Sequence, residues 1–396
     1  MVSDLGNALV YKGVNSLMLY NLKEVISDDF LGIISGFFSD DNIEEIMHDG
    51  VGCVKVYHAQ FGMCETNVTL SSTDVDGMIS KAVAFNGKVL SDSMRLFDGT
   101  LPDGSRINVV LPPVAVNGSA ITIRKFKKHV MTACDLVNSG VMNQEVCAFL
   151  WCCLDGLGHR PANILFSGGT SSGKTTLLNA LSLFIPFKSR IVTIEDTPEL
   201  RMPFSNIVRL ETSFEPLIDM DMLLRNTLRM RPDRIVVGEV RGAECKSLFT
   251  AMNTGHQGCM GTIHANDARE TIEKVVNPPM DVPSVMLKAL DLIVMVARKN
   301  VGGKITRVIT EISEVGGFEN DVPRLNTIYT FDANKGELRR TGVPSKIRAK
   351  ISEACGMAPA DFDRILRERT GVIDNLCRLR LDVSGFKKAV DEASGF

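Results

Sequence analysis

The stretch FSGGTSSGKTTLLNAL at residues 166–181 decides the fold. The pattern G-x-x-x-x-G-K-[ST] of a phosphate-binding loop is matched by Gly168, Gly173, Lys174 and Thr175. Such a loop needs a strand before it and a helix after it. The apolar run ANILF precedes it, and TTLLNALSLF follows it with leucines at helical spacing before a proline. The sequence therefore predicts a strand–loop–helix unit that binds nucleotide phosphates.

A loop of this kind holds phosphate mainly through its backbone. Glycines let the chain curl so that N–H groups point inward, and the start of the following helix adds partial positive charge. We expect Lys174 to reach the β- and γ-phosphates of ATP, and the hydroxyl of Thr175 to ligate Mg²⁺. The predicted ATP contacts of the loop are Gly168, Gly169, Thr170, Ser171, Ser172, Gly173, Lys174, Thr175 and Thr176.

The composition is that of an ordinary soluble protein. The chain has 396 residues, which gives room for about two to three domains. Of these residues 23% are charged, and the net charge is −3. No apolar run approaches the roughly 20 residues that span a bilayer, and no secretory signal is expected. Ten cysteines without a C-x-x-C pair suit buried, reduced thiols in the cytoplasm. The near-neutral charge argues against a broad nucleic-acid surface.

The pattern along the chain predicts four parts. We expect an N-terminal helical segment at residues 1–40, a small α+β domain at 41–126 and a linker at 127–142. From about 143 onward, predicted strands and helices alternate, which indicates a mostly parallel sheet covered by helices. The predicted fold class is therefore α/β, with the nucleotide site in a C-terminal domain at 143–396.

Acidic residues end two of the predicted strands. The segment RIVTIED brings Glu195 and Asp196, and RIVVGEVRG brings Glu239, to the sheet edge where α/β proteins bind ligands. The usual second nucleotide motif ends its strand in Asp, and Gly238 takes that place here. Mg²⁺ would then depend on Thr175, phosphates and water, with Glu195 or Asp196 in the outer shell. Glu239 is predicted to position the attacking water. Taken singly, each acid is explained equally well as a solvated loop carboxylate and as a residue of the nucleotide site.

Two histidines form a third signal. In NTGHQGCMGTIHANDA at 253–268, His264 directly follows a strand-like run and His256 precedes it. A lone histidine there would most often be a packing or capping residue. With Thr262 and Asn266 nearby, we expect the pair to sense the γ-phosphate. The spacing matches no zinc motif of the H-E-x-x-H kind.

In this setting the chain resembles the type II/type IV secretion ATPase superfamily, and is most similar to the motor ATPases of tight-adherence (Tad/Flp-type) pili. The resemblance covers roughly residues 43–300. Single motifs are modestly specific, whereas the ordered set is highly specific. In family order the matching segments are EIMHDG, LPDGSRINVVLPP, ITIRKF, FSGGTSSGKTTLLNALS, RIVTIEDTPEL, VRLET, LRNTLRMRPDRIVVGEVRGAE and AMNTGHQGCMGTIHAN.

The resemblance implies a subunit in which an N-terminal sensory domain is hinged to a RecA-like ATPase core, with six subunits in a ring. It also implies that Arg106 and Arg124 of the N-terminal domain approach the phosphates. The family arginine before LPDGSR is replaced by Thr100, and the arginine after VRLET by Ser213. The implied catalytic residues are Glu239, Glu195, Arg124, Arg106 and His264, and Asp196 and His256 are implied nucleotide contacts.

The function implied is an ATP-hydrolysing hexameric motor for pilus assembly (Tad/Flp or type IV-like) or for type II/IV protein secretion. It would act peripherally at the cytoplasmic face of the membrane on an integral membrane platform protein, without direct contact to nucleic acid. A conjugation-type ATPase that moves protein or DNA is the first alternative. A small-molecule kinase, a nucleic-acid translocase and a non-hydrolysing scaffold are weaker ones.

Overall fold

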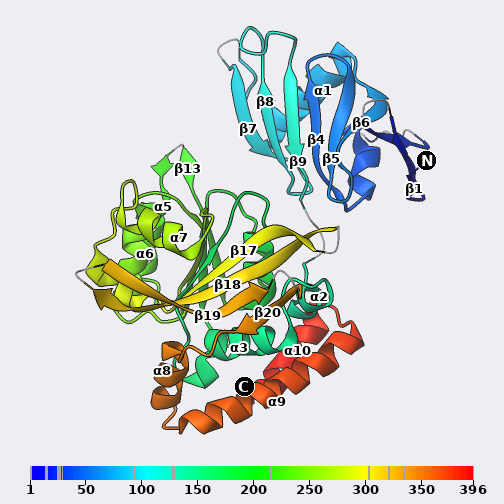
Figure 1. The fold of residues 1–396 in the computed structure, drawn as a ribbon. Helices are drawn as coiled ribbons and strands as arrows, with labels where there is room; N and C mark the ends of the chain where they lie inside the picture. Colours follow the sequence, from blue (N-terminus) through cyan, green and yellow to red (C-terminus); the bar gives the residue numbers. More distant parts are fainter. Residues whose placement is uncertain are drawn as a thin grey trace. The chain divides into compact units, whose positions relative to one another are not determined.

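The computed structural model describes residues 2–13, 17–24, 28, 30–91, 94–126, 130–214, 216–301, 304–319, 322–332 and 335–395. The chain divides into two compact units, Met1–His129 and Val130–Phe396, each with its own sheet and core (Figure 1). Across the described segments, no helix is both long enough and apolar enough to cross a membrane.

The first unit is built on one twisted sheet with α1 packed against it. Among the described residues this sheet has nine strands in the order β1-β2-β3-β6-β5-β4-β9-β8-β7. All neighbouring strands are antiparallel except β3 and β6, which run parallel. Its elements are β1 (Ser3–Asp4), β2 (Ala8–Lys12), β3 (Met18–Leu22), η2 (Ser35–Ser39), β4 (Ile43–Asp49), β5 (Cys53–His58), β6 (Gly62–Thr69), α1 (Ser72–Phe85), β7 (Leu96–Thr100), β8 (Arg106–Val110) and β9 (Ala120–Arg124).

The N-terminal segment differs from the helical segment expected at 1–40. Strands β2 and β3 form an antiparallel pair, and β3 continues the sheet by pairing with β6. Alternate side chains of these strands, including Val10 and Tyr20, are fully buried. Because this burial has a period of two residues, the segment joins the core of the first unit as strands.

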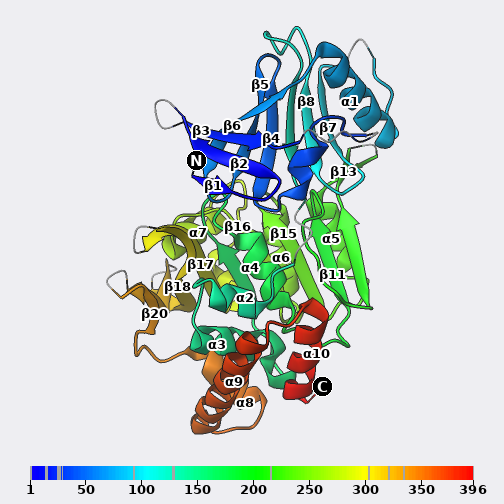
Figure 2. The same cartoon turned by 90° about the vertical axis from the view of Figure 1, so that its right-hand side faces the viewer.

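The second unit is an α/β domain (Figures 1 and 2). Its elements up to the last strand are α2 (Ala133–Asn138), α3 (Gln144–Asp155), η3 (Gly156–Gly158), β10 (Ile164–Ser167), α4 (Lys174–Ser182), β11 (Ile191–Glu195), β12 (Ile207–Glu211), β13 (Ser213–Phe214), β14 (Leu217–Ile218), α5 (Met220–Thr227), β15 (Arg234–Val240), α6 (Glu244–Asn253), β16 (Met260–Ile263), α7 (Ala268–Val276), η4 (Ser284–Ala289), β17 (Leu292–Val301), β18 (Lys304–Glu319), β19 (Val322–Asp332) and β20 (Glu337–Arg340). Three helices follow: α8 (Lys346–Ala354), α9 (Pro359–Leu379) and α10 (Val383–Ser394).

The main sheet of this unit has helices on both faces. Its strand order is β12-β11-β15-β16-β10-β17-β18-β19-β20, parallel from β12 to β17 and antiparallel beyond. Along β10, Ile164 and Phe166 face the core formed with α2, α3, α4 and the C-terminal helices. Leu165 faces the second core, formed with α5, α6 and α7. Burial on both faces explains why these strands read as continuous apolar runs.

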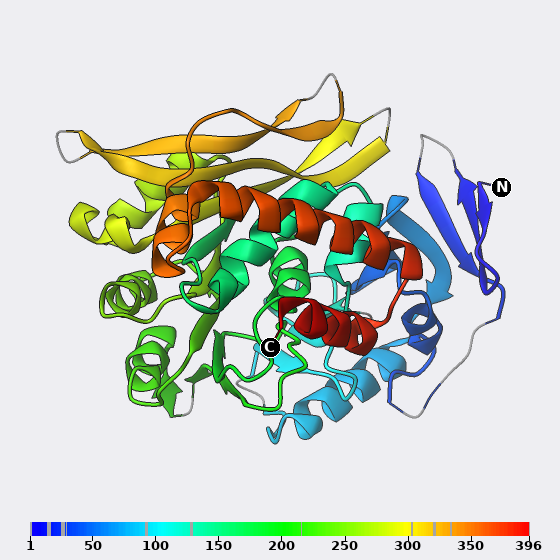
Figure 3. The ribbon, with the colours of Figure 1, turned by 90° about the horizontal axis from the view of Figure 1, so that it is seen from below.

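The C-terminal helices belong to the core of the second unit. Figure 3 shows α9 lying along α3. Arg369 of α9 donates a hydrogen bond to Asp155 at 2.6 Å, and its guanidinium carbon lies 4.4 Å from the centre of the Trp151 ring.

The predicted linker at 127–142 also differs from the structure. Residues 127–129 lie outside the described residues, and α2 within 130–142 buries Ala133, Cys134 and Leu136 in the same core.

Candidate functional site

The phosphate loop joins β10 to α4, which is the context that its sequence requires. Gly173 takes φ 98° at the start of α4, and Ser171 takes φ 56°, so the loop curls through two left-handed residues. The ammonium of Lys174 donates to the carbonyl oxygens of Gly168 at 2.9 Å and Gly169 at 3.0 Å. These bonds hold the lysine charge at the mouth of the loop, where phosphate oxygens would bind.

Gly168 allows the loop to leave the sheet beside β17. A β-carbon at Gly168 would lie 2.1 Å from the carbonyl oxygen of Val296 and 2.6 Å from the hydroxyl oxygen of Ser172. The first contact is with backbone, so no rotamer change relieves it. The glycine is therefore needed for close packing rather than for an unusual φ.

Glu195 ends β11 and is nearly buried, with 3% of its surface exposed. Its Oε1 accepts hydrogen bonds from the backbone N–H groups of Glu199 at 2.8 Å and Leu200 at 2.9 Å. Burial raises the pKa of Glu195 to about 7, although these two bonds favour the ionised form. The carboxyl therefore exchanges a proton near neutral pH, at the edge of the sheet that carries the phosphate loop.

Asp196 lies one residue further and is held by two partners. It accepts a hydrogen bond from Thr212 Oγ1 at 3.2 Å and forms an ion pair with Arg241. Arg241 follows β15, so this ion pair joins the ends of two neighbouring strands. Sequence reasoning missed Arg241, although it stands two residues after Glu239 in a matched segment.

Glu239 lies in an irregularity of β15. The pairing with β16 shifts between Val237 and Val240, so Gly238 and Glu239 together face a single residue of β16. The carbonyl of Gly238 accepts from Thr262 Oγ1 at 2.6 Å. An irregularity of this kind turns a side chain away from the regular alternation of a strand. Glu239 is half-buried at this position.

The two histidines are not brought together. His264 follows β16, and its Nδ1 lies 3.4 Å from Thr170 Oγ1 of the phosphate loop. His256 precedes β16, so it lies at the opposite end of that strand. There the backbone N–H of Cys259, three residues after His256, donates a hydrogen bond to Oδ1 of Asn163, which comes directly before β10. The expectation that both histidines lie at the phosphate-loop edge therefore holds for His264 and differs from the structure for His256.

The predicted arginines lie in the first unit and form a row across three strands. Arg106 on β8 lies directly opposite Arg124 on β9, and Thr100 on β7 lies directly opposite Arg106. Both arginines are exposed. Thr100, where the resemblance expects a third arginine, thus occupies the next position of the same row.

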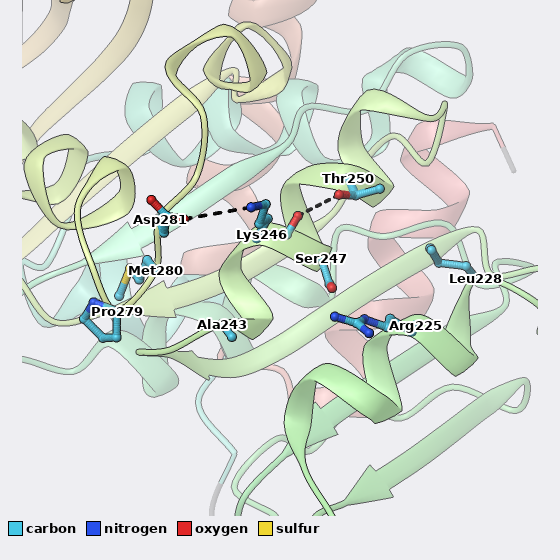
Figure 4. Close-up of a pocket in the computed structure, with 9 residues that line it drawn as sticks. All are labelled: Arg225, Leu228, Ala243, Lys246, Ser247, Thr250, Pro279, Met280 and Asp281. Atoms are coloured by element: carbon cyan, nitrogen blue, oxygen red, sulfur yellow. Dashed lines mark hydrogen bonds and ion pairs between the residues drawn. The ribbon is translucent and has the colours of Figure 1, made fainter.

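A separate pocket of about 470 Å³ lies between α5, α6 and the turn after α7 (Figure 4). Lys246 lies 3.9 Å from Asp281 across it, and none of its lining residues belongs to the phosphate loop. The lining residues are Arg225, Leu228, Ala243, Lys246, Ser247, Thr250, Pro279, Met280 and Asp281.

Within the described part of the chain, no group of three or more His, Cys, Asp or Glu side chains could hold a metal ion. Thr175, half-buried in the first turn of α4, offers one hydroxyl beside the loop. This fits a magnesium ion that takes its other ligands from phosphate and water.

Comparisons with known proteins agree with this geometry. Residues 70–314 match the family model described as "Type II/IV secretion system protein". An uncharacterized protein of Methanocaldococcus jannaschii is 45% identical over 238 residues, 58% of this chain and 33% of that protein. The conjugal transfer protein TrbB of Rhizobium radiobacter is 36% identical over 239 residues, 58% of this chain and 71% of that protein.

A solved structure of the pilus retraction motor PilT with bound ADP shares the fold. It aligns with a TM-score of 0.51 and 18% identity over 91% of this chain and 95% of that one. The predicted α/β fold class, a RecA-like P-loop core with a smaller N-terminal domain, is confirmed. The aligned segment spans a third of the archaeal relative's length. The family model covers more than half of the chain, and the protein belongs to the type II/IV secretion system protein family.

Proposed function

We propose that the protein is an ATP-hydrolysing motor that works as a homo-hexamer and moves protein at the cytoplasmic face of a membrane. Its task would be pilus assembly, of the Tad/Flp or type IV-like kind, or type II/IV secretion. The partner would be an integral membrane platform protein, contacted peripherally and without direct binding of nucleic acid.

The observation that carries this proposal is the convergence of the phosphate loop with three carboxylates and His264 at one sheet edge. In the proposed site the loop and Lys174 bind the β- and γ-phosphates, and Glu239 orients the attacking water. Glu195 and Asp196 line the sheet edge next to Glu239. A magnesium ion held by Thr175 would neutralise phosphate charge. The contribution of Arg106 and Arg124 to the same neutralisation remains a prediction from the resemblance.

The similarity to TrbB supports a second candidate, a conjugation-type ATPase that moves protein or DNA. The two functions share the same nucleotide chemistry and differ in the membrane protein that the ring engages. Crosslinking in cells, followed by identification of the crosslinked membrane protein, separates them. A pilus platform protein supports the first function, and a component of a conjugation channel supports the second.

Phosphate release and mass photometry, with and without ATP, test the motor itself. We expect a hexamer that hydrolyses ATP slowly. Glu239→Gln should lower kcat about a hundredfold or more while assembly and ATP binding persist. Glu273→Gln is the matched control, because that carboxylate is 61% exposed on α7. A monomer that turns over ATP after a metabolite is added would overturn the proposal and favour a kinase.

A further inference from the structure

The strand order distinguishes two flanks of the phosphate loop. The loop follows β10, and the strands that carry Glu195 and Glu239, β11 and β15, lie on one side of it. On the other side β17 pairs with β10 over Leu292–Met295 and then continues to Val301, while β10 ends at Ser167. The paired strands β17 and β18 therefore extend along the flank of the loop that faces away from the carboxylates.

This arrangement orients a nucleotide along the sheet edge. Hydrolysis requires the γ-phosphate to lie beside the residue that positions water, which is Glu239 on the β15 side. The polyphosphate then follows the loop toward the start of α4. A nucleotide bound in this direction would have its nucleoside on the flank formed by β17 and β18.

Arg307 of β18 contacts the loop from that flank. Its Nε donates to the carbonyl oxygen of Ser171 at 3.2 Å. Its Cδ lies 3.1 Å from the place that a β-carbon of Gly173 would take. The N–H groups of a phosphate loop point inward, whereas this carbonyl accepts a bond from outside. The guanidinium thus lies against the outer wall of the loop, beside Gly173, the residue that precedes α4.

Arg298 strengthens the positive charge of this flank. In the antiparallel pairing of β17 with β18, Arg298 lies directly opposite Arg307. Directly opposite residues share one face of the sheet, and like charges at such positions are destabilising. Arg298 is exposed, and in the parts of the chain that the structure covers no carboxylate forms an ion pair with it. Two adjacent guanidinium groups favour a ligand with negative charge or an aromatic face.

We propose that Arg307 and Arg298 bind the nucleoside end of the nucleotide. The planar guanidinium of Arg307 stacks on the purine ring, and Arg298 adds positive charge toward the α-phosphate. This inference rests on the proposed function, because it requires a nucleotide at the loop. It adds a nucleoside subsite formed by β17 and β18 to the phosphate contacts formed by α4 and its loop.

Calorimetric titration with ATP and with inorganic tripolyphosphate tests the subsite, since tripolyphosphate has the phosphates without the nucleoside. We expect Arg307→Ala to raise the Kd for ATP about tenfold and Arg298→Ala about threefold. Both variants should leave the Kd for tripolyphosphate within about twofold of the wild type. Lys174→Ala should weaken the binding of both ATP and tripolyphosphate. Lys299→Ala is the control, because Lys299 is exposed on the opposite face of the same strand.

Arg307→Lys keeps the charge but loses the planar stacking group, so its affinity for ATP should also fall. If Arg307→Ala lost affinity for ATP and for tripolyphosphate by the same factor, the subsite would be overturned. Arg307 would then act by maintaining the conformation of the phosphate loop. Unchanged ATP affinity of Arg307→Ala would overturn the subsite as well. A wild-type protein that binds neither ligand would instead refute nucleotide binding, and with it the proposed function. Thermal unfolding of each variant verifies that it is folded.

Discussion

Glu195 occupies the space beside Gly238 that a larger residue would need. A β-carbon at Gly238 would lie 2.9 Å from Cγ and 3.2 Å from Oε1 of Glu195. The Glu195 side chain cannot easily move, because backbone N–H groups of Glu199 and Leu200 hold its carboxyl. The glycine at the place where a strand-ending aspartate is usual therefore gives room to a buried acid from the neighbouring strand.

Gly238→Ala should destabilise the second unit by about 1–3 kcal/mol, because the added methyl group overlaps a pinned side chain. Chemical denaturation measures this change. Gly371→Ala is the control, because no atom lies within 4 Å of a β-carbon there and alanine favours the helix α9. Equal stability of Gly238→Ala and the wild type would show that Glu195 moves freely.

Glu195→Gln should remove a pH dependence of stability. The fold raises the pKa of Glu195 to about 7 from an ordinary value of 4.5. Below the lower value the carboxyl is protonated in the folded and unfolded chains, so the stability is fully present. As the pH rises from 4.5 to about 7, a few kcal/mol of stability should be lost, because in this range the unfolded chain ionises at this carboxyl while the folded chain keeps its proton. Urea unfolding between about pH 4 and 8 follows the loss.

The glutamine variant should show a flatter profile over that window, since its amide stays neutral and Oε1 still accepts the two backbone bonds. Glu273→Gln, at an exposed position, should keep the wild-type profile. Parallel profiles of wild type and Glu195→Gln would contradict the raised pKa.

Gly168→Ala should disrupt the phosphate loop. The new methyl group would lie 2.1 Å from a backbone oxygen of Val296, so the loop or β17 must shift. We expect a lower melting temperature together with at least tenfold weaker ATP binding. Gly169→Ala is the stability control, because nothing lies within 4 Å of the place that its β-carbon would take. Equal melting temperatures for the two variants would argue against the close approach of β17.

The buried ion pair of Asp155 and Arg369 should anchor the C-terminal helices. Asp155 is 1% exposed and Arg369 8%, and burial raises the pKa of Asp155. Arg369→Met leaves a buried carboxylate without its cation and should cost about 3–5 kcal/mol. Adding Asp155→Asn to that variant should recover part of the loss, which a double-mutant cycle by urea unfolding would quantify. Strictly additive losses would show that the pair is not coupled.

Much of the site was predictable because its signals are local. The spacing of Gly168, Gly173 and Lys174 requires a particular turn between a strand and a helix, and the structure has that turn. The end of a parallel strand likewise predicted where Glu195 and His264 lie. His256 differs, because seven residues that include the whole strand β16 separate it from His264, and proximity in sequence does not place both at one edge.

The N-terminal residues show another limit. The strands β2 and β3 are short, and β3 pairs with β6, whose residues lie 46 positions further along the chain, as Tyr20 opposite Thr66 illustrates. A single sequence carries no signal for such pairing, whereas the helical spacing in α4 is visible within one segment.

The sequence by itself determined the phosphate loop, the alternation of strands and helices, and the acids that end the strands, because each depends on neighbouring residues. Tertiary structure alone decided which side chains share the edge. The strand order places β17 and β18 on the opposite flank from Glu239, brings Arg307 to Ser171, and joins Arg241 to Asp196. These contacts cross strands that are distant in the chain, so their geometry follows from packing of the whole sheet.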